Sequence, residues 1–123
     1  EVSVGELLDK ISILEIKKEK IKDPEKLKFI KKEYEILKDQ LDKNTNYDAK
    51  IDDLYNQLKD INSKLWVIED EKRECEKNKD FNEKFIKLSR DVHFLNDDRA
   101  KVKLEINNYT GSNIKEIKEY TSY

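Results

Sequence analysis

The fold is decided by two consecutive stretches: YDAKIDDLYNQLKDINSKLWVIEDEKREC, residues 47–75, and FNEKFIKLSRDVHFLNDDRAKVKLEINNY, residues 81–109. In each, the residues met at alternating steps of four and three are apolar, with two exceptions, Lys72 and Arg99. This spacing places them along one stripe of an α-helix. Because only residues 78–80 separate the two predicted helices, the stretches predict one long antiparallel helical hairpin with an apolar seam. The seam residues are Tyr47, Ile51, Leu54, Leu58, Ile61, Leu65, Ile68, Lys72 and Cys75, then Phe81, Phe85, Leu88, Val92, Leu95, Arg99, Val102, Ile106 and Tyr109.

The composition of the whole chain agrees with an all-α fold. Of its 123 residues, 44% are charged and 36% hydrophobic, and there are only two glycines and one proline. Such a chain lacks the turn residues of a sheet-rich fold and suits long helices. Disorder is the alternative for a highly charged chain. The net charge of only −2 and the strong apolar periodicity favour an ordered helical protein.

Charge, cysteine content and hydropathy exclude several classes of protein. A nearly neutral chain whose lysines alternate with acidic residues lacks the basic face typical of nucleic-acid binding. A single cysteine, Cys75, cannot form a disulfide within the chain and is interpreted as a small buried hydrophobic residue. No apolar run approaches the roughly 18 residues of a membrane span. The default expectation is therefore a cytoplasmic protein that binds neither nucleic acid nor membrane.

Cap signals divide the chain into four helices at about 4–22, 24–43, 46–77 and 81–110, followed by a C-terminal tail, 112–123. A Ser or Asp followed three residues later by Glu is a capping box, and Pro is favoured at the first helical position. Glycine just after a helix suits the left-handed conformation of a helix end. The residues assigned to these roles are Ser3 with Glu6, Asp23 with Pro24, Asp80 with Glu83, and Gly111.

Helix lengths and short connections predict the architecture. Neighbouring helices should be antiparallel, so the second helix folds back on the start of the third. A four-helix section then forms from residues 4–22, 24–43, 46–66 and 92–110, and residues 1–111 make one helical-bundle domain. Residues 67–91 should project beyond it as a two-stranded coiled coil. Because such a projection buries little surface, we expect it to bind a second copy or another protein partner.

One seam residue, Arg99, marks a candidate site. A cation on an apolar seam needs a partner, because leaving it unpaired costs several kcal/mol. Glu6, Asp9 or Glu15 of the first helix could supply the carboxylate. The predicted register brings Asn62, Lys59 and Tyr55 toward Asn96 and Arg99. The full candidate ligand-binding set is Glu6, Asp9, Lys10, Glu15, Asn62, Trp66, Glu69, Asn96, Arg99 and Lys103.

Two interpretations of this polar set stay open. In the first, Arg99 forms a structural ion pair that fixes the register, or its guanidinium reaches past the seam to solvent. The protein is then a non-enzymatic interaction or oligomerisation module, acting as a homodimer. In the second, the set lines a pocket for a small ligand or anion inside the bundle, with or without catalysis. The sequence assigns no catalytic residue to either interpretation.

Metal and cofactor chemistry are weakly supported. The single histidine, His93, has no second ligand at a suitable spacing. Glu71 and Glu74 have the spacing of the carboxylate pair in all-helical nucleotide pyrophosphohydrolases, but the second pair that a magnesium site requires is missing. We therefore expect neither a bound metal nor a cofactor.

Three segments resemble a family of small, functionally uncharacterised all-helical proteins of bacteria and phages. They are SVGELLDKISILEIK at residues 3–17, LWVIED at 65–70 and NDDRAKVKLEI at 96–106. The resemblance covers most of the chain. The resemblance singles out Glu6, Asp9, Lys10, Glu15, Lys17, Trp66, Glu69, Asp70, Asn96, Arg99 and Lys103. It implies a shared site at these polar positions, and it suggests a link to surface-polysaccharide metabolism.

Overall fold

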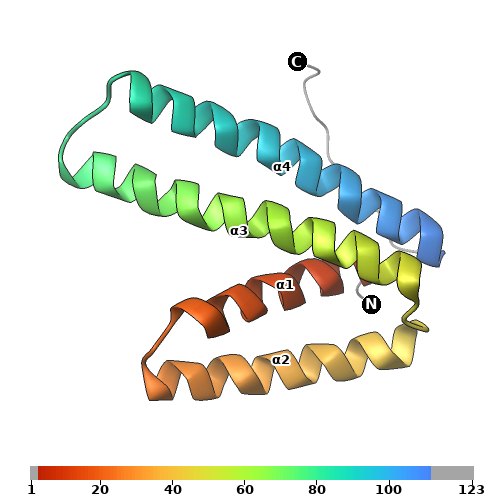
Figure 1. Ribbon diagram of the computed structural model, residues 1–123. Helices are drawn as coiled ribbons and strands as arrows, with labels where there is room; N and C mark the ends of the chain where they lie inside the picture. The colour runs from red at the N-terminus through yellow and green to blue at the C-terminus, as the bar shows by residue number, and fades with distance from the viewer. Residues whose placement is uncertain (1–2, 112–123) are drawn as a thin grey trace.

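The computed structural model describes residues 3–111 and folds them into four α-helices (Figure 1). They are α1 (Val4–Lys20), α2 (Pro24–Asn44), α3 (Ala49–Lys77) and α4 (Glu83–Thr110). The described residues contain no strand, so the predicted all-α class is confirmed. The predicted tail, 112–123, lies outside the described residues, and the assignment of 1–111 to a single domain stays a prediction.

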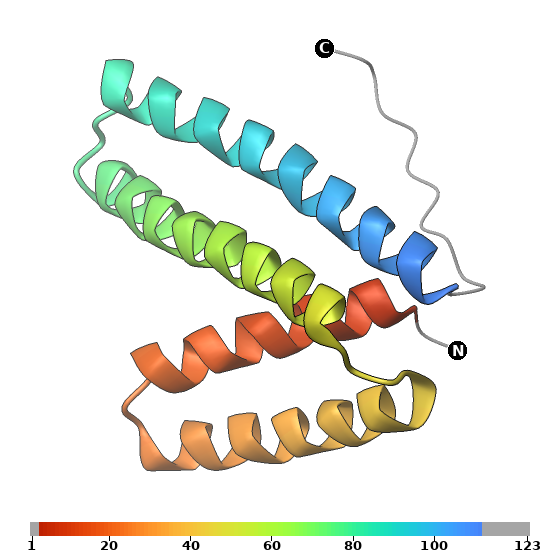
Figure 2. The ribbon, with the colours of Figure 1, turned by 45° about the vertical axis from the view of Figure 1, so that its right-hand side comes forward.

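The helices form two antiparallel hairpins, α1–α2 and α3–α4, and α1 is the element that joins them. The backbone of α1 approaches those of α2, α3 and α4, whereas within residues 3–111 the backbone of α2 comes close only to α1. Figures 1 and 2 show α1 lying between α2 and the longer hairpin. The prediction that the second helix packs along the start of the third is therefore wrong.

The physical reason is the apolar surface of α1, which is not confined to one side. Leu8 and Ile11 face the core, and Leu7, Leu14 and Ile16 are also almost completely buried. A helix that is apolar on several sides is stabilised at the centre of a bundle. The contiguous core lies where α1 meets α2, α3 and α4, and its residues are Val4, Leu8, Ile11, Leu41, Ile51, Leu54, Tyr55, Leu58, Val102 and Ile106.

The helix ends test the predicted caps. Ser3 caps α1 by accepting a hydrogen bond from the Glu6 N–H, and Asp23 with Pro24 starts α2, as predicted. Gly111 ends α4 with φ of 68°, in the left-handed region, also as predicted. The capping box at Asp80 is wrong, because α4 begins later and is capped by Asn82. α3 likewise begins later than expected, at Ala49.

The long hairpin has the predicted antiparallel register. Near its open end, the Tyr109 hydroxyl donates a hydrogen bond to Asp48 over 2.6 Å, and Lys50 pairs with Glu105 at 3.5 Å. In Figures 1 and 2 the opposite end of the hairpin reaches past the α1–α2 connection. Between residues 67 and 91 only Cys75 and Leu88 are buried. That segment thus projects as expected, while its packing as a coiled coil stays a prediction.

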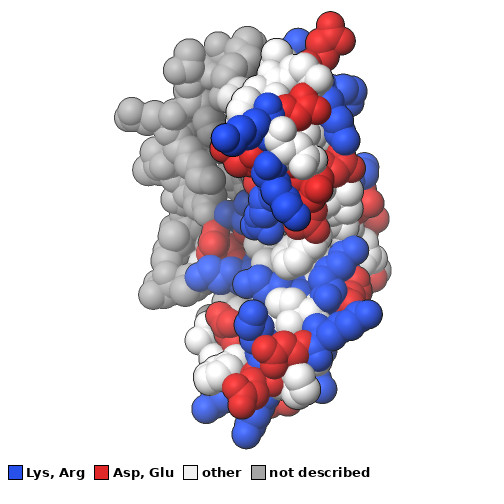
Figure 3. Space-filling model, turned by 90° about the vertical axis from the view of Figure 1, so that its left-hand side faces the viewer, with Lys and Arg blue, Asp and Glu red and all other residues white. Residues whose placement is uncertain are grey.

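The surface carries mixed charge. Figure 3 shows lysine and arginine interspersed with aspartate and glutamate on one face, without a large area of a single sign. Within the described residues, no helix is long and apolar enough to span a membrane.

Candidate functional site

The candidate site is built around Asp9, a carboxylate on α1 whose residue is only 1% exposed. Asp9 follows the core residue Leu8 on α1, and its side chain points toward both α3 and α4. A buried carboxylate is costly unless it is paired and hydrogen-bonded. Its partners therefore define how the three helices fit together.

Arg99 of α4 supplies the opposite charge. Its Nε donates to Asp9 Oδ1 over 2.9 Å and its Nη2 to Oδ2 over 2.5 Å, which makes a two-bonded, fork-like pair. The predicted need of Arg99 for a carboxylate is thus met by Asp9, one of the three acids proposed. The Arg99 side chain is 29% exposed, so its outer edge still reaches the surface.

Asn62 of α3 completes the arrangement. Its Nδ2 donates to Asp9 Oδ1 over 2.9 Å and to the Ser12 hydroxyl over 2.8 Å. Ser12 in turn donates to the Asp9 backbone carbonyl over 2.7 Å. One carboxylate is therefore held by polar groups from α1, α3 and α4, and each polar group has a partner.

A second ion pair extends the site toward the start of α1. Lys103 of α4 is only 6% exposed, and its Nζ lies 2.7 Å from Glu6 Oε2 and 3.8 Å from Asp9 Oδ2. One turn further along α4, Asn107 Oδ1 accepts a hydrogen bond from the Gly5 N–H over 2.8 Å. This satisfies a backbone donor that the first turn of a helix leaves unpaired.

A small pocket of about 210 Å³ opens beside the Arg99 pair. Three of the candidate residues predicted from the sequence, Asn62, Trp66 and Glu69, line it together with Arg99. Its other walls come from α1 and α3: Ile13, Ile16, Leu65, Asp70 and Arg73. The polar set therefore does border a cavity, and that cavity is mostly apolar with charged groups at its edge.

Glu15 belongs to a separate cluster on the other side of α1. Lys59 Nζ lies 3.1 Å from Glu15 Oε2 and 3.0 Å from Glu19 Oε1, and the Tyr34 hydroxyl donates to Glu15 Oε1 over 3.4 Å. Burial acts to raise the pKa of Glu15, but Tyr55, Lys59 and Tyr34 outweigh it, and the pKa is lowered.

The pKa values of the tyrosines in this cluster are raised, whereas that of Glu15 is lowered. The Tyr55 hydroxyl is buried near Glu15 without a hydrogen bond of ordinary geometry. Burial first, and then the Glu15 carboxylate, raises its pKa far above the usual value of 10.0. The pKa of Tyr34 is also raised, for the same two reasons.

The structure brings together seven of the ten candidate residues and leaves three apart. Glu6, Asp9, Asn62, Trp66, Glu69, Arg99 and Lys103 converge on the ion pairs or on the pocket. Lys10 and Asn96 are exposed and outside the site, and Glu15 lies in the cluster with Lys59. The expected approach of Lys59 and Tyr55 to Arg99 is wrong, because both lie beside Glu15.

Sequence reasoning missed Ser12 and Asn107, which both hold polar groups of the site. Ser12 lies three residues after Asp9, the spacing at which helix neighbours share a face, so it could have been found. Asn107 follows the seam residue Ile106 and has no such signal. In residues 3–111, no group of three or more His, Cys, Asp or Glu is placed to hold a metal ion.

Comparisons with known proteins place the chain in a family. No curated protein and no solved structure matches it. A family model described as a family of unknown function (DUF6165) matches residues 1–123. The resemblance to a functionally uncharacterised family is therefore confirmed at that level, while the bacterial and phage origin and the shared sequence pattern stay predictions. The chain belongs to this family of unknown function.

Proposed function

We propose that the protein is a non-enzymatic interaction module that forms a homodimer through an open apolar groove on the α3–α4 hairpin. The observation that carries the proposal is the groove itself, a hollow of about 610 Å³ that no residue of α1 or α2 lines. Its residues are Ser63, Lys64, Val67 and Ile68 of α3, and Asp91, Phe94 and Leu95 of α4.

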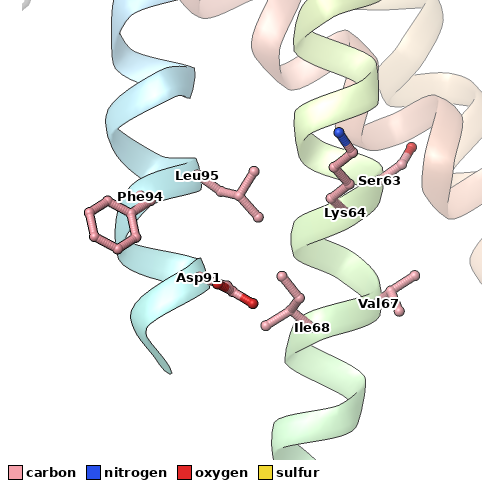
Figure 4. A pocket seen from close by; sticks show the side chains of 7 residues that line it. All are labelled: Ser63, Lys64, Val67, Ile68, Asp91, Phe94 and Leu95. Atoms are coloured by element: carbon pink, nitrogen blue, oxygen red, sulfur yellow. The ribbon is translucent and has the colours of Figure 1, made fainter. Parts of the chain in front are cut away.

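The groove exposes apolar side chains on the face of the hairpin that α1 leaves uncovered. Val67 is 47% exposed and Phe94 51%, although both belong to long, well-formed helices. Figure 4 shows Ile68 and Leu95 between the two helices, with Phe94 at the outer edge. A contiguous apolar patch bordered by charges is typical of a protein-interaction surface.

The charges beside the groove favour a second copy as the occupant. Lys64 stands on the α3 side at the level of Leu95, and Asp91 on the α4 side one turn nearer the hairpin tip, at the level of Ile68. A two-fold axis parallel to the helices would lay α3 of one copy over α4 of the other. The long Lys64 side chain, which can span one turn, then comes within reach of the partner's Asp91, so one interface gains two complementary pairs. Within residues 3–111, Lys64 and Asp91 make only exposed ion pairs, with Asp60 and Lys87 respectively, of about 0–1 kcal/mol each.

A charge exchange tests this geometry. Lys64→Glu alone and Asp91→Lys alone each place like charges opposite one another in the dimer. We expect either change to raise the dimer dissociation constant about tenfold or more, a loss of roughly 1.4 kcal/mol. The double variant restores opposite charges and should recover most of the affinity. Sedimentation equilibrium over a range of micromolar concentrations measures all four constants.

Two phenylalanines provide a matched control for the apolar part. Phe94→Glu, in the groove, should abolish the dimer. Phe29→Glu, on α2 and 76% exposed, should leave it intact. A protein that is strictly monomeric throughout contradicts the proposal. So does a dimer that Phe29→Glu breaks and Phe94→Glu leaves intact, because the interface would then lie on α2.

A further inference from the structure

The pocket beside Arg99 has a charge balance that decides which ligands it suits. Arg99 is neutralised by Asp9, Lys103 by Glu6, and Arg73 by Asp70 at 3.4 Å. Each of the three cations at or behind the pocket thus has its own carboxylate. A fourth carboxylate, Glu69, lines the pocket and makes no ion pair or hydrogen bond within residues 3–111. One negative charge is left over.

Trp66 stands next to this carboxylate. Glu69 follows it by three residues on α3, so the two side chains share a helix face, and both line the pocket. The face of a tryptophan attracts cations, and a neighbouring carboxylate strengthens that attraction. Together, the ring of Trp66 and the carboxylate of Glu69 provide the groups that attract the positive charge of an ammonium ion.

The rest of the pocket is apolar. Ile13 and Ile16 of α1 and Leu65 of α3 form its inner wall. The pocket volume of about 210 Å³ equals the volume that about seven molecules occupy in liquid water, so only a small ligand fits. An apolar wall suits the methyl and methylene groups of an alkylammonium ion, whose charge is spread over its alkyl surface.

We propose that this pocket binds a small organic cation, an alkylammonium ion, with its charge between Trp66 and Glu69 and its alkyl groups against Ile13 and Ile16. The sequence left open whether a pocket here would take a small neutral or charged ligand or an anion. An anion is disfavoured because Arg99 and Lys103 are already paired with Asp9 and Glu6.

Trp66 is the only tryptophan in the chain, so its fluorescence reports directly on the pocket. The full chain is titrated with choline chloride and tetramethylammonium chloride at constant ionic strength. We expect a saturable change in Trp66 emission with both. Sodium phosphate, sodium chloride and 3,3-dimethylbutanol, a neutral compound shaped like choline, should give no saturable change.

Glu69→Gln keeps the shape of the side chain and removes its charge, so choline binding should weaken at least about tenfold, or 1.4 kcal/mol. Glu71→Gln is the matched control, because Glu71 is exposed on the same helix and does not line the pocket. Circular dichroism checks that both variants keep the native helix content. A saturable response to phosphate, an equal response to the neutral compound, or no response to either cation would overturn the proposal.

Discussion

At the scale of single residues, Asp9 shows how a buried charge can determine the way helices pack. Its carboxylate has almost no contact with water, and its compensation comes from Arg99 and Asn62 on two other helices. Removing one partner of a buried pair leaves a charge that the interior cannot solvate. The effect of a substitution here therefore depends on whether one charge or both are removed.

Arg99→Met should lower the free energy of unfolding by about 3 kcal/mol, because it leaves Asp9 without its main cation. Urea unfolding followed by circular dichroism measures this. The matched control is Arg73→Met, which breaks an exposed pair with Asp70 and should cost less than about 1 kcal/mol. Equal effects of the two substitutions would contradict the assignment of Arg99 as the partner of a buried charge.

Asp9→Leu combined with Arg99→Met should be more stable than Arg99→Met alone. The double variant removes both charges, and replacing a whole buried pair with apolar residues is often neutral or stabilising. The coupling energy of the double-mutant cycle gives the strength of the pair. A double variant that is less stable than Arg99→Met alone would show that Asp9 stabilises the fold through Asn62 or Lys103 and not through the arginine.

Glu15 gives a prediction about acid stability. Its folded pKa is lowered from the ordinary value of 4.5, so its charged form stabilises the fold. This contribution is fully present above pH 4.5 and is lost as the pH falls through the lower, folded pKa. Glu15→Gln should therefore reduce stability at pH 7 and flatten the decline below pH 4.5. Denaturation of both proteins from pH 7 to pH 3 measures the two slopes, and parallel slopes would contradict the prediction.

The sequence could predict that Arg99 needs a carboxylate, because its place on an apolar seam is visible in the heptad. It could not choose among Glu6, Asp9 and Glu15, since that choice depends on how α1 is rotated against the hairpin. Asn96 was misplaced for a similar reason. It follows the seam residue Leu95, and one step along a helix turns the side chain by about 100°, here toward solvent.

At the scale of elements, the contact between α1 and α4 is set by Gly5. A Cβ on this residue would lie 2.6 Å from the Lys103 carbonyl oxygen and 2.7 Å from Asn107 Oδ1. Gly5→Ala should therefore push the two helices apart, at a cost of about 1–3 kcal/mol. The better helix propensity of alanine recovers only about 1 kcal/mol of that cost.

Gly111→Ala is the control for Gly5→Ala. A Cβ at Gly111 would meet open space, so the substitution would affect only the backbone, whose φ of 68° is unfavourable for alanine. Thermal unfolding gives both stabilities, and two-dimensional NMR of the amides separates the mechanisms. Shifts should spread over α1 and α4 in Gly5→Ala and stay near the C-terminus of α4 in Gly111→Ala. A stable Gly5→Ala variant with unchanged α4 amides would show that the close approach does not constrain packing.

Helix ends were predictable where the capping residue adjoins a clear apolar period, as at Ser3 and Asp23. The turn between α3 and α4 was harder, because acceptable caps occur at both Asp80 and Asn82. The backbone decides between them: Lys79 adopts φ of 54°, and the Asp80 N–H bonds back to the Cys75 carbonyl. The turn therefore ends α3 with Asp80 still inside it, and the first free cap is Asn82.

At the scale of the whole molecule, the sequence predicted four antiparallel helices and the register of the long hairpin, but it wrongly packed α2 against the start of α3. The heptads define contacts within the hairpin, and no comparable pattern says which helix the hairpin packs against. The signal was present in the apolar residues on a second side of α1, such as Ile16, which is 1% exposed. α1 can be assigned to the centre only by comparing this arrangement with the alternative in which α2 packs against the hairpin.

Central and peripheral helices should differ in hydrogen exchange. Within residues 3–111, α1 packs against every other helix, whereas the backbone of α2 approaches only that of α1, and only Ile30 and Leu41 of α2 are buried. Amides of elements with few buried contacts exchange through local opening. We expect α1 to exchange most slowly, and α2 and the hairpin tip to exchange faster.

If the groove dimerises, protection around residues 63–68 and 91–95 should rise with protein concentration, while that of α2 stays constant. Hydrogen exchange measured by mass spectrometry at two protein concentrations separates these effects. If the protection of α2 amides rose with concentration, the dimer interface would lie on α2 and not in the groove.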